Sequence, residues 1–242
     1  MGKYGNRELA KRRAAFTRLE LLACLCTVAL LLTIIIPSLA KAATRSDRVA
    51  CLNNLRQIGN AYCQLGLEDP YGRPPWRKTT PEGGNSDSPF RSNLAWQFSI
   101  ISNWLESPKY LADPGDPRPT LNRAQHWGTT PGGLLNPSYG YNALSYWLGL
   151  DGNFQLPRTI LSTDRNIVGQ ANVTGSSSFI SPYTTVDPST TSWTNDVHGL
   201  SGNVLFFDGS GLQLDSPGLR ATLDAARNPA RGTLPLRMLA PF

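Results

Sequence analysis

One stretch of the chain is too long and too apolar to be an ordinary segment of a compact domain. Residues 21–36 hold only apolar side chains, two cysteines and two threonines, and residues 37–40 extend the run to 20 positions. As an α-helix, 20 residues span about 30 Å, which matches the hydrocarbon core of a bilayer. No other segment of the sequence is comparable. The run therefore predicts a single membrane span near the N-terminus.

The charges before this run predict its orientation. Residues 1–15 contribute +4 of the net charge of +6, from five basic side chains against Glu8. The positive-inside rule keeps such a segment in the cytoplasm, so the residues after the run are expected on the other side of the membrane. The small remaining charge is spread over the rest of the chain, which argues against a nucleic-acid partner.

Three kinds of processing signal fit this N-terminus. An ordinary secretory signal would use residues 11–13 as its basic region and would be cleaved at residues 40–42 (Ala-Lys-Ala). The apolar run is longer than the usual segment of about 7–15 residues in such signals. A lipoprotein signal would use residues 21–24 (Leu-Leu-Ala-Cys), which lie at the start of the run instead of after it. The third signal rests on residues 15–20 (Ala-Phe-Thr-Arg-Leu-Glu).

This third arrangement resembles the prepilin leader of type IV pilins and type II secretion pseudopilins. A short basic leader is followed by Phe16 and Thr17, by Glu20, and then by about 20 apolar residues that include Pro37. The resemblance implies cleavage between Ala15 and Phe16 by a prepilin peptidase, with N-methylation of the new terminus. It implies a filament subunit with a pilin-like fold.

Glu20 is the residue to which the resemblance gives a role in assembly. A carboxylate in an apolar run is costly, and cleavage would create an ammonium on Phe16, four residues back on the same helical face. The two charges could neutralise each other within one chain. The resemblance implies instead that Glu20 pairs with the Phe16 amine of a neighbouring subunit. The alternative is a carboxylate near a helix N-terminus, favoured by the helix dipole. The sequence departs from the family pattern at Ala15, where Gly is usual, and at Arg18, where an apolar residue is usual.

After residue 40 the pattern changes from uniformly apolar to amphipathic. Apolar residues recur at spacings of three and four, which predicts one buried helical stripe: Val49, Leu52, Leu55, Ile58, Tyr62 and Leu65. Gly66 and the Asp69-Pro70 pair predict the end of the helix. A helix from Phe16 to Leu65 would be about 75 Å long. Pro37 predicts a kink, because proline removes an internal hydrogen bond.

These patterns divide the chain into four parts. Residues 1–15 form a basic leader, and residues 16–40 form a helix for the membrane or for a filament core. Residues 41–66 continue that helix with one apolar face, and residues 67–242 form a head. The 22 Gly and 19 Pro favour short strands and turns in the head. The expected fold class is α+β, with a long helix packed on a small antiparallel β head.

The cysteines predict no intrachain disulfide on the helix. Cys51 and Cys63 are twelve residues apart, or about 18 Å along a helix, and a disulfide needs Cα atoms within about 7 Å. We expect both to be packed side chains, with a bridge between subunits left open, and Cys24 and Cys26 to be inert. No cysteine or histidine spacing is typical of zinc sites, so the sequence predicts no structural metal.

The head is expected to contain turns, one short helix and several strands. Residues 69–89, with five Pro and three Gly, predict an irregular loop or a mobile connection. Residues 92–105 predict a short helix. The expected strands are Asn166–Gln170, Ser178–Ser181 and Asn203–Phe207, followed by a hairpin return through Leu212–Leu214. Residues 217–242 are expected to run as a tail across the head surface, with a short helix at Leu219–Arg227.

A second motif stands near the C-terminus. His198 is followed by nine residues and then by Asp208 and Gly209, which resembles a His-nine-residue-Asp-Gly signature attached to such prepilins. The simplest interpretation is structural, with a turn at Asp208-Gly209 and His198 bonded to nearby backbone. A calcium site is the alternative, with Asp187, Asp196 and Asp208 as candidate ligands. The third option is a hydrolase with His198 as base, although no G-x-S-x-G motif is present.

The sequence therefore predicts a pseudopilin-like structural subunit of a type II secretion or type IV pilus-like filament. It would be a single-pass protein of the bacterial cytoplasmic membrane, with its head periplasmic or extracellular. The implied partners are the prepilin peptidase, other pseudopilin subunits, and an inner-membrane assembly platform with its ATPase. We expect no enzymatic activity, no cofactor and no nucleic acid.

The alternative is a single-pass, membrane-anchored binding or surface protein that does not polymerise. Six Trp and eight Tyr are compatible with carbohydrate stacking in such a protein. An anchored enzyme is a third possibility.

Overall fold

The fold divides into two compact units, Met1–Ala43 and Thr44–Phe242. The computed structural model describes residues 17–118, 122–174, 183–226 and 236–240. The predicted cleavage site at Ala15 and Phe16 lies outside the described residues, as does the expected strand Ser178–Ser181.

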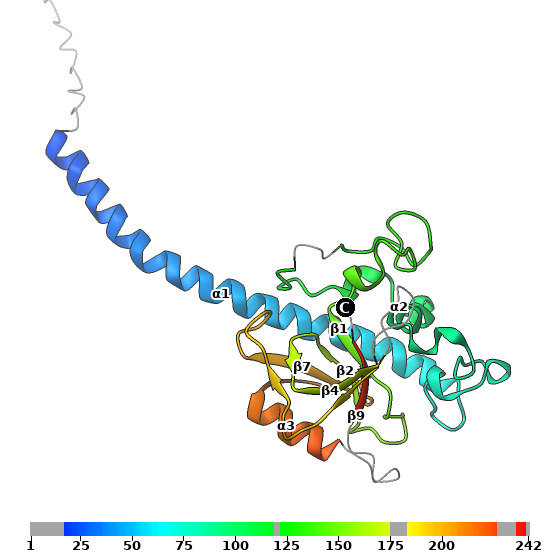
Figure 1. Cartoon of the computed structure of the whole chain (residues 1–242). Coiled ribbons are helices and arrows are strands. Elements are labelled where there is room, and N and C mark those ends of the chain that lie inside the picture. Colours follow the sequence, from blue (N-terminus) through cyan, green and yellow to red (C-terminus); the bar gives the residue numbers. More distant parts are fainter. Residues whose placement is uncertain (1–16, 119–121, 175–182, 227–235, 241–242) are drawn as a thin grey trace, which may run out of the picture. The chain divides into compact units, whose positions relative to one another are not determined.

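A single long helix, α1, runs from Arg18 to Leu67 (Figure 1). The prediction of one long helix is therefore confirmed, and the helix ends within two residues of the predicted end at Leu65. Pro37 lies inside α1 without ending it. The kink expected at Pro37 stays a prediction.

In the first unit, α1 is apolar and its side chains are exposed. Within residues 18–39 the large aliphatic side chains are between 45% and 81% exposed. The three hydroxyl groups of this stretch all donate to the carbonyl three residues back: Thr27 to Cys24, Thr33 to Leu30 and Ser38 to Ile35, at 2.7–2.8 Å. Among the described residues, α1 is the one helix long and apolar enough to cross a membrane, features that a signal sequence shares.

In the second unit, α1 packs one face into the core. The buried residues follow a spacing of four and three: Cys51, Leu55, Ile58, Tyr62 and Leu65. This face is rotated from the predicted stripe, because Val49 is 67% exposed and Leu52 is only partly buried. The small side chain of Cys51 takes the place in the core that the sequence pattern gave to Leu52.

Seven antiparallel strands form the main sheet of the second unit, in the order β4-β5-β9-β1-β2-β7-β8. Among them, Figure 1 labels β1, β2, β4, β7 and β9. Their bounds are Tyr146–Gly149 (β1), Ile160–Asp164 (β2), Gln170–Thr174 (β4), Tyr183–Val186 (β5), Ser201–Phe206 (β7), Gly211–Asp215 (β8) and Leu236–Leu239 (β9). Two further short strands, β3 (Ile167–Val168) and β6 (Ser192–Trp193), pair with each other. The α+β class with an antiparallel sheet is confirmed.

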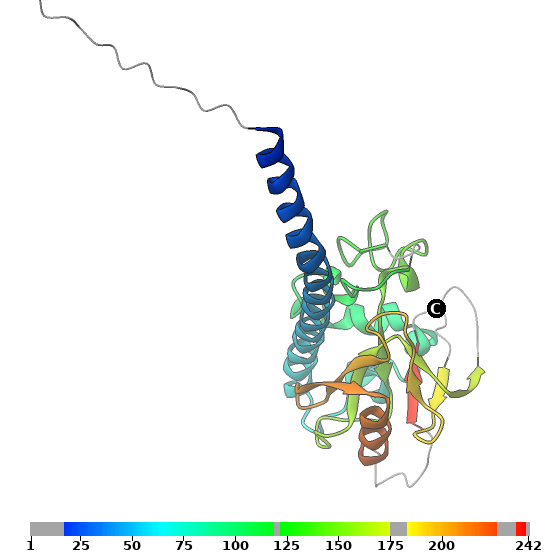
Figure 2. The ribbon, with the colours of Figure 1, turned by 90° about the vertical axis from the view of Figure 1, so that its left-hand side faces the viewer.

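The sheet carries a separate apolar core on each face. On β7, Leu205 joins the core that contains the buried face of α1, whereas Val204 and Phe206 join the core that contains helix α3 (Ser216–Ala225). This alternation is the expected consequence of the two-residue period of a strand. Figures 1 and 2 both show α3 beside the strands. The described head is therefore layered, with α1 and α3 against opposite faces of the sheet.

The C-terminal residues correct one prediction. Residues 217–242 were expected to form a surface tail, but β9 lies inside the sheet, between β5 and β1. Met238 and Leu239 are buried, and Arg237 is paired with Asp151. The strand β9 has only four residues, of which three are apolar. A run this short can form an interior strand, but it is too short to be recognised as a strand from the sequence. The helix expected near Leu219 is confirmed as α3.

The Pro/Gly-rich segment is also more ordered than its composition predicts. Within residues 69–89 it forms two 3₁₀ turns, η1 (Pro75–Arg77) and η2 (Thr80–Glu82), each with Pro in its first two positions. Trp76 is buried in the core, and its Nε1 donates to the carbonyl of Leu150 at 3.2 Å. Proline in the first two positions of these turns removes no internal hydrogen bond, because the first N–H groups of a helix have no partner within it.

The stretch after this segment contains the expected short helix. It is divided into η3 (Pro89–Ser92), α2 (Leu94–Ser99) and η4 (Ile100–Asn103), followed by η5 (Pro108–Leu111) and, further along, η6 (Gly140–Ala143). Asn93 caps α2 by accepting a hydrogen bond from the backbone N–H of Trp96 at 2.9 Å.

The predicted hairpin is confirmed, and one predicted strand is divided. The Asp208-Gly209 pair forms the turn between β7 and β8, with a φ of +78° at Gly209 that glycine adopts without strain. The strand expected at Asn166–Gln170 is broken at Gly169, whose φ is +90°. Residues 167–168 therefore pair in the small sheet, and the chain turns before β4.

Candidate functional site

The first candidate site is the start of α1, where Thr17 and Glu20 cap the helix. The Glu20 carboxylate accepts hydrogen bonds from the Thr17 backbone N–H at 2.9 Å and from the Thr17 hydroxyl at 3.0 Å. The Thr17 hydroxyl in turn accepts from the Glu20 backbone N–H at 3.2 Å. This reciprocal arrangement is a capping box. It holds the Glu20 carboxylate at the helix N-terminus, which is where the alternative interpretation places it.

The C-terminal motif does not bring its histidine to its aspartate. Asp208 is exposed on the β7–β8 hairpin, where its carboxylate accepts from the Ser210 backbone N–H at 2.8 Å. His198 lies in the loop between β6 and β7 and is 1% exposed. The turn-forming role of Asp208 and Gly209 agrees with the structural interpretation. The imidazole of His198, in contrast, faces other acidic groups.

The three calcium candidates stand on three different loops. Asp187 accepts from the backbone N–H and hydroxyl of Ser189, Asp196 from the hydroxyl of Thr194, and Asp208 from Ser210. Each carboxylate is thus used within its own turn. The calcium site stays a prediction, and within the described ranges a different group of side chains lies close enough to share one ion.

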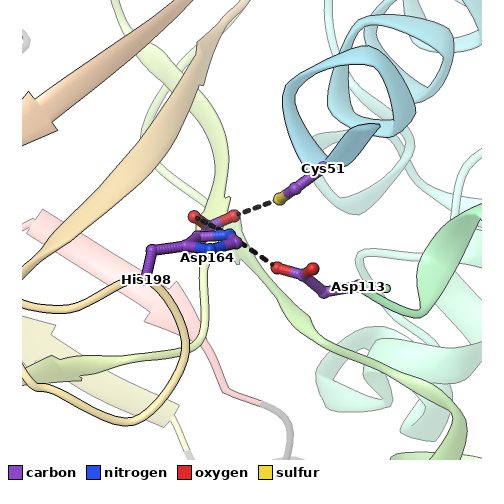
Figure 3. A group of neighbouring side chains, drawn as sticks. All are labelled: Cys51, Asp113, Asp164 and His198. Carbon is purple, nitrogen blue, oxygen red and sulfur yellow. Dashed lines mark hydrogen bonds and ion pairs between the residues drawn. The ribbon is translucent and has the colours of Figure 1, made fainter. Parts of the chain in front are cut away.

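That group is a buried cluster of Cys51, Asp113, Asp164 and His198 (Figure 3). One ligand atom from each residue lies within 4.8 Å of every other. The Cys51 Sγ is 2.9 Å from Asp164 Oδ1 and donates its proton to it. The His198 Nε2 is 2.9 Å from Asp113 Oδ2 and 3.6 Å from Asp164 Oδ2. None of the four residues is more than 1% exposed.

Four separate parts of the head supply these side chains. Cys51 comes from the buried face of α1, Asp113 from the turn after η5, Asp164 from the end of β2, and His198 from the β6–β7 loop. In Figure 3 the imidazole of His198 points between the two carboxylates, and the thiol of Cys51 approaches from α1.

Backbone N–H groups fix the two carboxylates. Asp113 Oδ1 accepts from the N–H of Gly115 at 2.7 Å, and Asp164 Oδ2 accepts from the N–H of Asn203 at 2.7 Å. Both bonds are charge-assisted and short. Each carboxylate therefore keeps its second oxygen directed at the interior of the cluster.

The loop that carries His198 is held by its backbone. Its carbonyl accepts from the guanidinium of Arg48 on α1, and from the hydroxyl of Ser201 at 2.7 Å. Gly199 and Leu200 follow with φ values of +63° and +58°. A leucine in this left-handed region is strained by about 1–2 kcal/mol. The strained turn is what reverses the chain after His198 and keeps its ring inside.

Burial and like charge shape the titration of the cluster. Burial, together with the charge of Asp113, raises the pKa of Asp164 to about 7. Burial also raises the pKa of the Cys51 thiol, and the two carboxylates raise it further. For His198, burial opposes the charged form, but Asp113 and Asp164 raise its pKa on balance. The cluster therefore favours a neutral thiol on Cys51 and a charged imidazole on His198.

Sequence reasoning missed three of these four residues. Cys51 was predicted to be a packed side chain, with a bridge between subunits left open, and Asp113 and Asp164 were not singled out. The structure shows that Asp164 ends β2, in which every residue is buried, but nothing in the sequence indicates this burial. Only His198 was singled out, through its motif.

The cluster offers no surface on which a substrate could bind. A general base must come within hydrogen-bond reach of the proton it removes, and His198 is enclosed. The geometry therefore gives no support to a hydrolase that uses this histidine. A buried set of thiol, imidazole and carboxylates is suited instead to holding parts of the fold together.

Comparison with known proteins identifies no relative of this chain. No family model, no curated protein and no solved structure matches the chain.

Proposed function

We propose that this chain is a pseudopilin-like structural subunit, anchored by one membrane span and assembled into a type II secretion or type IV pilus-like filament. The observation that carries the proposal is the change of surroundings along α1. Residues 18–39 expose apolar side chains, whereas Cys51, Leu55 and Ile58 on the same helix are fully buried in the head. An exposed apolar surface of this length marks contact with a membrane or with other proteins.

The hydroxyl groups of residues 18–39 support a lipid environment. Thr27, Thr33 and Ser38 each satisfy their donor within the helix. In a bilayer no water is present to satisfy a free polar group, so internal hydrogen bonds are required. The same helical surface, removed from the bilayer, can pack against identical helices in a filament core.

The proposed mechanism is mechanical and uses no catalytic step of this chain. A prepilin peptidase cleaves before Phe16 on the cytoplasmic side of the bacterial inner membrane. Glu20 then pairs with the new Phe16 ammonium of a neighbouring pseudopilin subunit, which sets the axial register. An assembly platform and its ATPase move subunits out of the bilayer, and the heads follow on the periplasmic or extracellular side.

The N-terminus of the protein isolated from native membranes tests this proposal. Intact mass and N-terminal sequencing are expected to give a methylated chain that starts at Phe16. A chain that starts after residue 40 or 42 would be a secreted head and would overturn the proposal. An intact N-terminus would overturn processing by a prepilin peptidase.

One observation favours a second function, that of a membrane-anchored binding or surface protein that does not polymerise. The Glu20 carboxylate already has partners in its own chain, the N–H and hydroxyl of Thr17. In such an anchor the carboxylate only caps the helix. Self-association of the full chain in membranes separates the two functions, because the anchor alone requires none.

A further inference from the structure

We propose that Cys51, Asp113, Asp164 and His198 bind one structural zinc ion. The four side chains place a sulfur, a nitrogen and two carboxylate oxygens within 4.8 Å of one another. The inference does not depend on filament assembly, because all four residues belong to the second unit, Thr44–Phe242.

The donor set selects the metal. Zinc is bound in proteins by thiolate, imidazole and carboxylate, and four protein ligands give the closed tetrahedral coordination of structural sites. Calcium and magnesium take oxygen ligands, so they do not use a cysteine and a histidine. The four ligand residues are each at most 1% exposed, so the ion would have no open coordination position for a substrate. The ion is therefore assigned a structural role.

Polar atoms without partners point to a ligand at the same place. Among the described residues, Asp113 Oδ2 and both ring nitrogens of His198 are buried and have no hydrogen-bond partner. His198 Nε2 and Asp113 Oδ2 lie 2.9 Å apart, at ion-pair distance, and neither atom forms a hydrogen bond of normal geometry. Buried polar groups in native proteins are nearly always satisfied. A metal ion accepts the lone pairs of Asp113 Oδ2 and His198 Nε2 without requiring them to face each other; His198 Nδ1 is not coordinated by the same ion.

The surrounding contacts orient the ligands as in known metal sites. The N–H of Gly115 holds one oxygen of Asp113, and the N–H of Asn203 holds one oxygen of Asp164. Such contacts from outside the coordination sphere fix ligating carboxylates. The inner oxygens, Asp113 Oδ2 and Asp164 Oδ1, are left to face Cys51 and His198. Coordination replaces the thiol proton of Cys51 and the proton on His198 Nε2, and both protons leave to solvent.

The charge of the cluster also fits a divalent cation. Two carboxylates are buried beside one imidazole, so negative groups outnumber positive ones at the centre of the cluster. Arg48 is the nearby cation, and its guanidinium bonds the His198 carbonyl instead of a carboxylate. A divalent ion between the carboxylates removes their repulsion. It ties α1, the turn after η5, β2 and the β6–β7 loop together at one point.

Metal analysis of the full chain in detergent, purified without chelators, tests the proposal. We expect about one zinc per chain by inductively coupled plasma mass spectrometry. Cys51→Ser and His198→Gln should lose most of the zinc. Matched controls are Cys63→Ser, on the same helix but outside the cluster, and His126→Gln, the other histidine of the chain. Both controls should keep their zinc. Folded Cys51→Ser or His198→Gln chains that retain full zinc would overturn the assignment.

A second measurement needs no variant. Zinc is removed from the unmodified chain with a chelator and Co²⁺ is added. A tetrahedral site with one thiolate is expected to give a sulfur-to-cobalt charge-transfer band and visible d–d bands, which added Zn²⁺ abolishes. If the unmodified chain carries less than about a tenth of an equivalent of zinc and gives no cobalt spectrum, the cluster is not a metal site.

Discussion

The thiol of Cys51 on α1 donates to the carboxylate of Asp164 at the end of β2, across 2.9 Å. This contact joins the long helix to the middle of the sheet, at residues 113 positions apart in the chain. It also places α1 in direct contact with a buried group of ionisable side chains in the head. The stability of the head is therefore coupled to what this cluster binds.

Removal of metal should lower the thermal stability of the head. An ion present at about 100 times its dissociation constant stabilises a folded protein by about 2.7 kcal/mol, equivalent to about 5–10 °C for a domain of this size. We expect treatment with a chelator to lower Tm by that amount, and zinc to restore it. Differential scanning fluorimetry in detergent measures the shift. Equal melting curves with and without chelator would contradict a bound structural ion.

Glu20→Gln should separate helix capping from filament assembly. Glutamine satisfies a capping box as glutamate does, but it carries no charge for a neighbouring ammonium. We therefore expect Glu20→Gln to insert in the membrane normally and to lose assembly, measured by crosslinking of subunits in native membranes. Thr17→Ala is the matched control, since it removes the hydroxyl of the cap and keeps the charge. Normal crosslinking of Glu20→Gln would favour the anchor that does not polymerise.

Asp116 should make the head sensitive to acid. Its carboxylate accepts two hydrogen bonds from Arg165 at 2.7 and 2.8 Å, and others from Arg118 and Ser145. Burial opposes ionisation, but these donors hold the pKa of Asp116 well below its usual range. Because the folded pKa is the lower one, the stabilisation is complete above the unfolded pKa of about 3.9 and is lost as the pH falls below it.

The matching variant is Asp116→Asn, which leaves the two guanidinium groups without their carboxylate. We expect a loss of about 3 kcal/mol at neutral pH, and a smaller difference from the unmodified chain near pH 2–3. Urea unfolding at several pH values measures both quantities. Asp196→Asn, at an exposed position, should change little. A difference that stays constant with pH would show that Asp116 does not act through its charge.

Leu239→Ala tests whether the C-terminal residues belong to the core. Leu239 is fully buried on β9, and truncation of such a side chain costs about 2–5 kcal/mol. Leu236, on the same strand, is only partly buried, so Leu236→Ala should cost less. Chemical denaturation gives both values. If both variants lowered the free energy of unfolding by equally small amounts, the segment would instead be the surface tail that the sequence predicted.

The parts of the fold that were predictable are those with local signals. The long helix follows from an apolar run joined to a three-and-four spacing, and the hairpin follows from the Asp208-Gly209 pair. Each of these signals lies within a few residues, so neighbouring side chains determine the structure. The rotation of the buried face toward Cys51 was not predictable, since cysteine counts weakly as an apolar residue in such a pattern.

The buried cluster was not predictable because its members share no local pattern. Asp113 follows a short 3₁₀ turn and resembles any turn aspartate, and Asp164 ends a strand whose last three residues are all polar. Their meeting depends on the pairing of β2 with β7 and on the packing of α1, both of which are tertiary. The same holds for β9. Its four residues form a strand through backbone pairing with β1 on one side and β5 on the other, which is also a tertiary interaction.

The position of β9 sets the order in which the head can be completed. Because β9 separates β5 from β1, those two strands cannot belong to one sheet until residues 236–239 arrive. In chain order, β9 is the last of the described strands. Long-range pairing of this kind is slow compared with local structure. The seven-stranded sheet can therefore become continuous only after β9 has joined it.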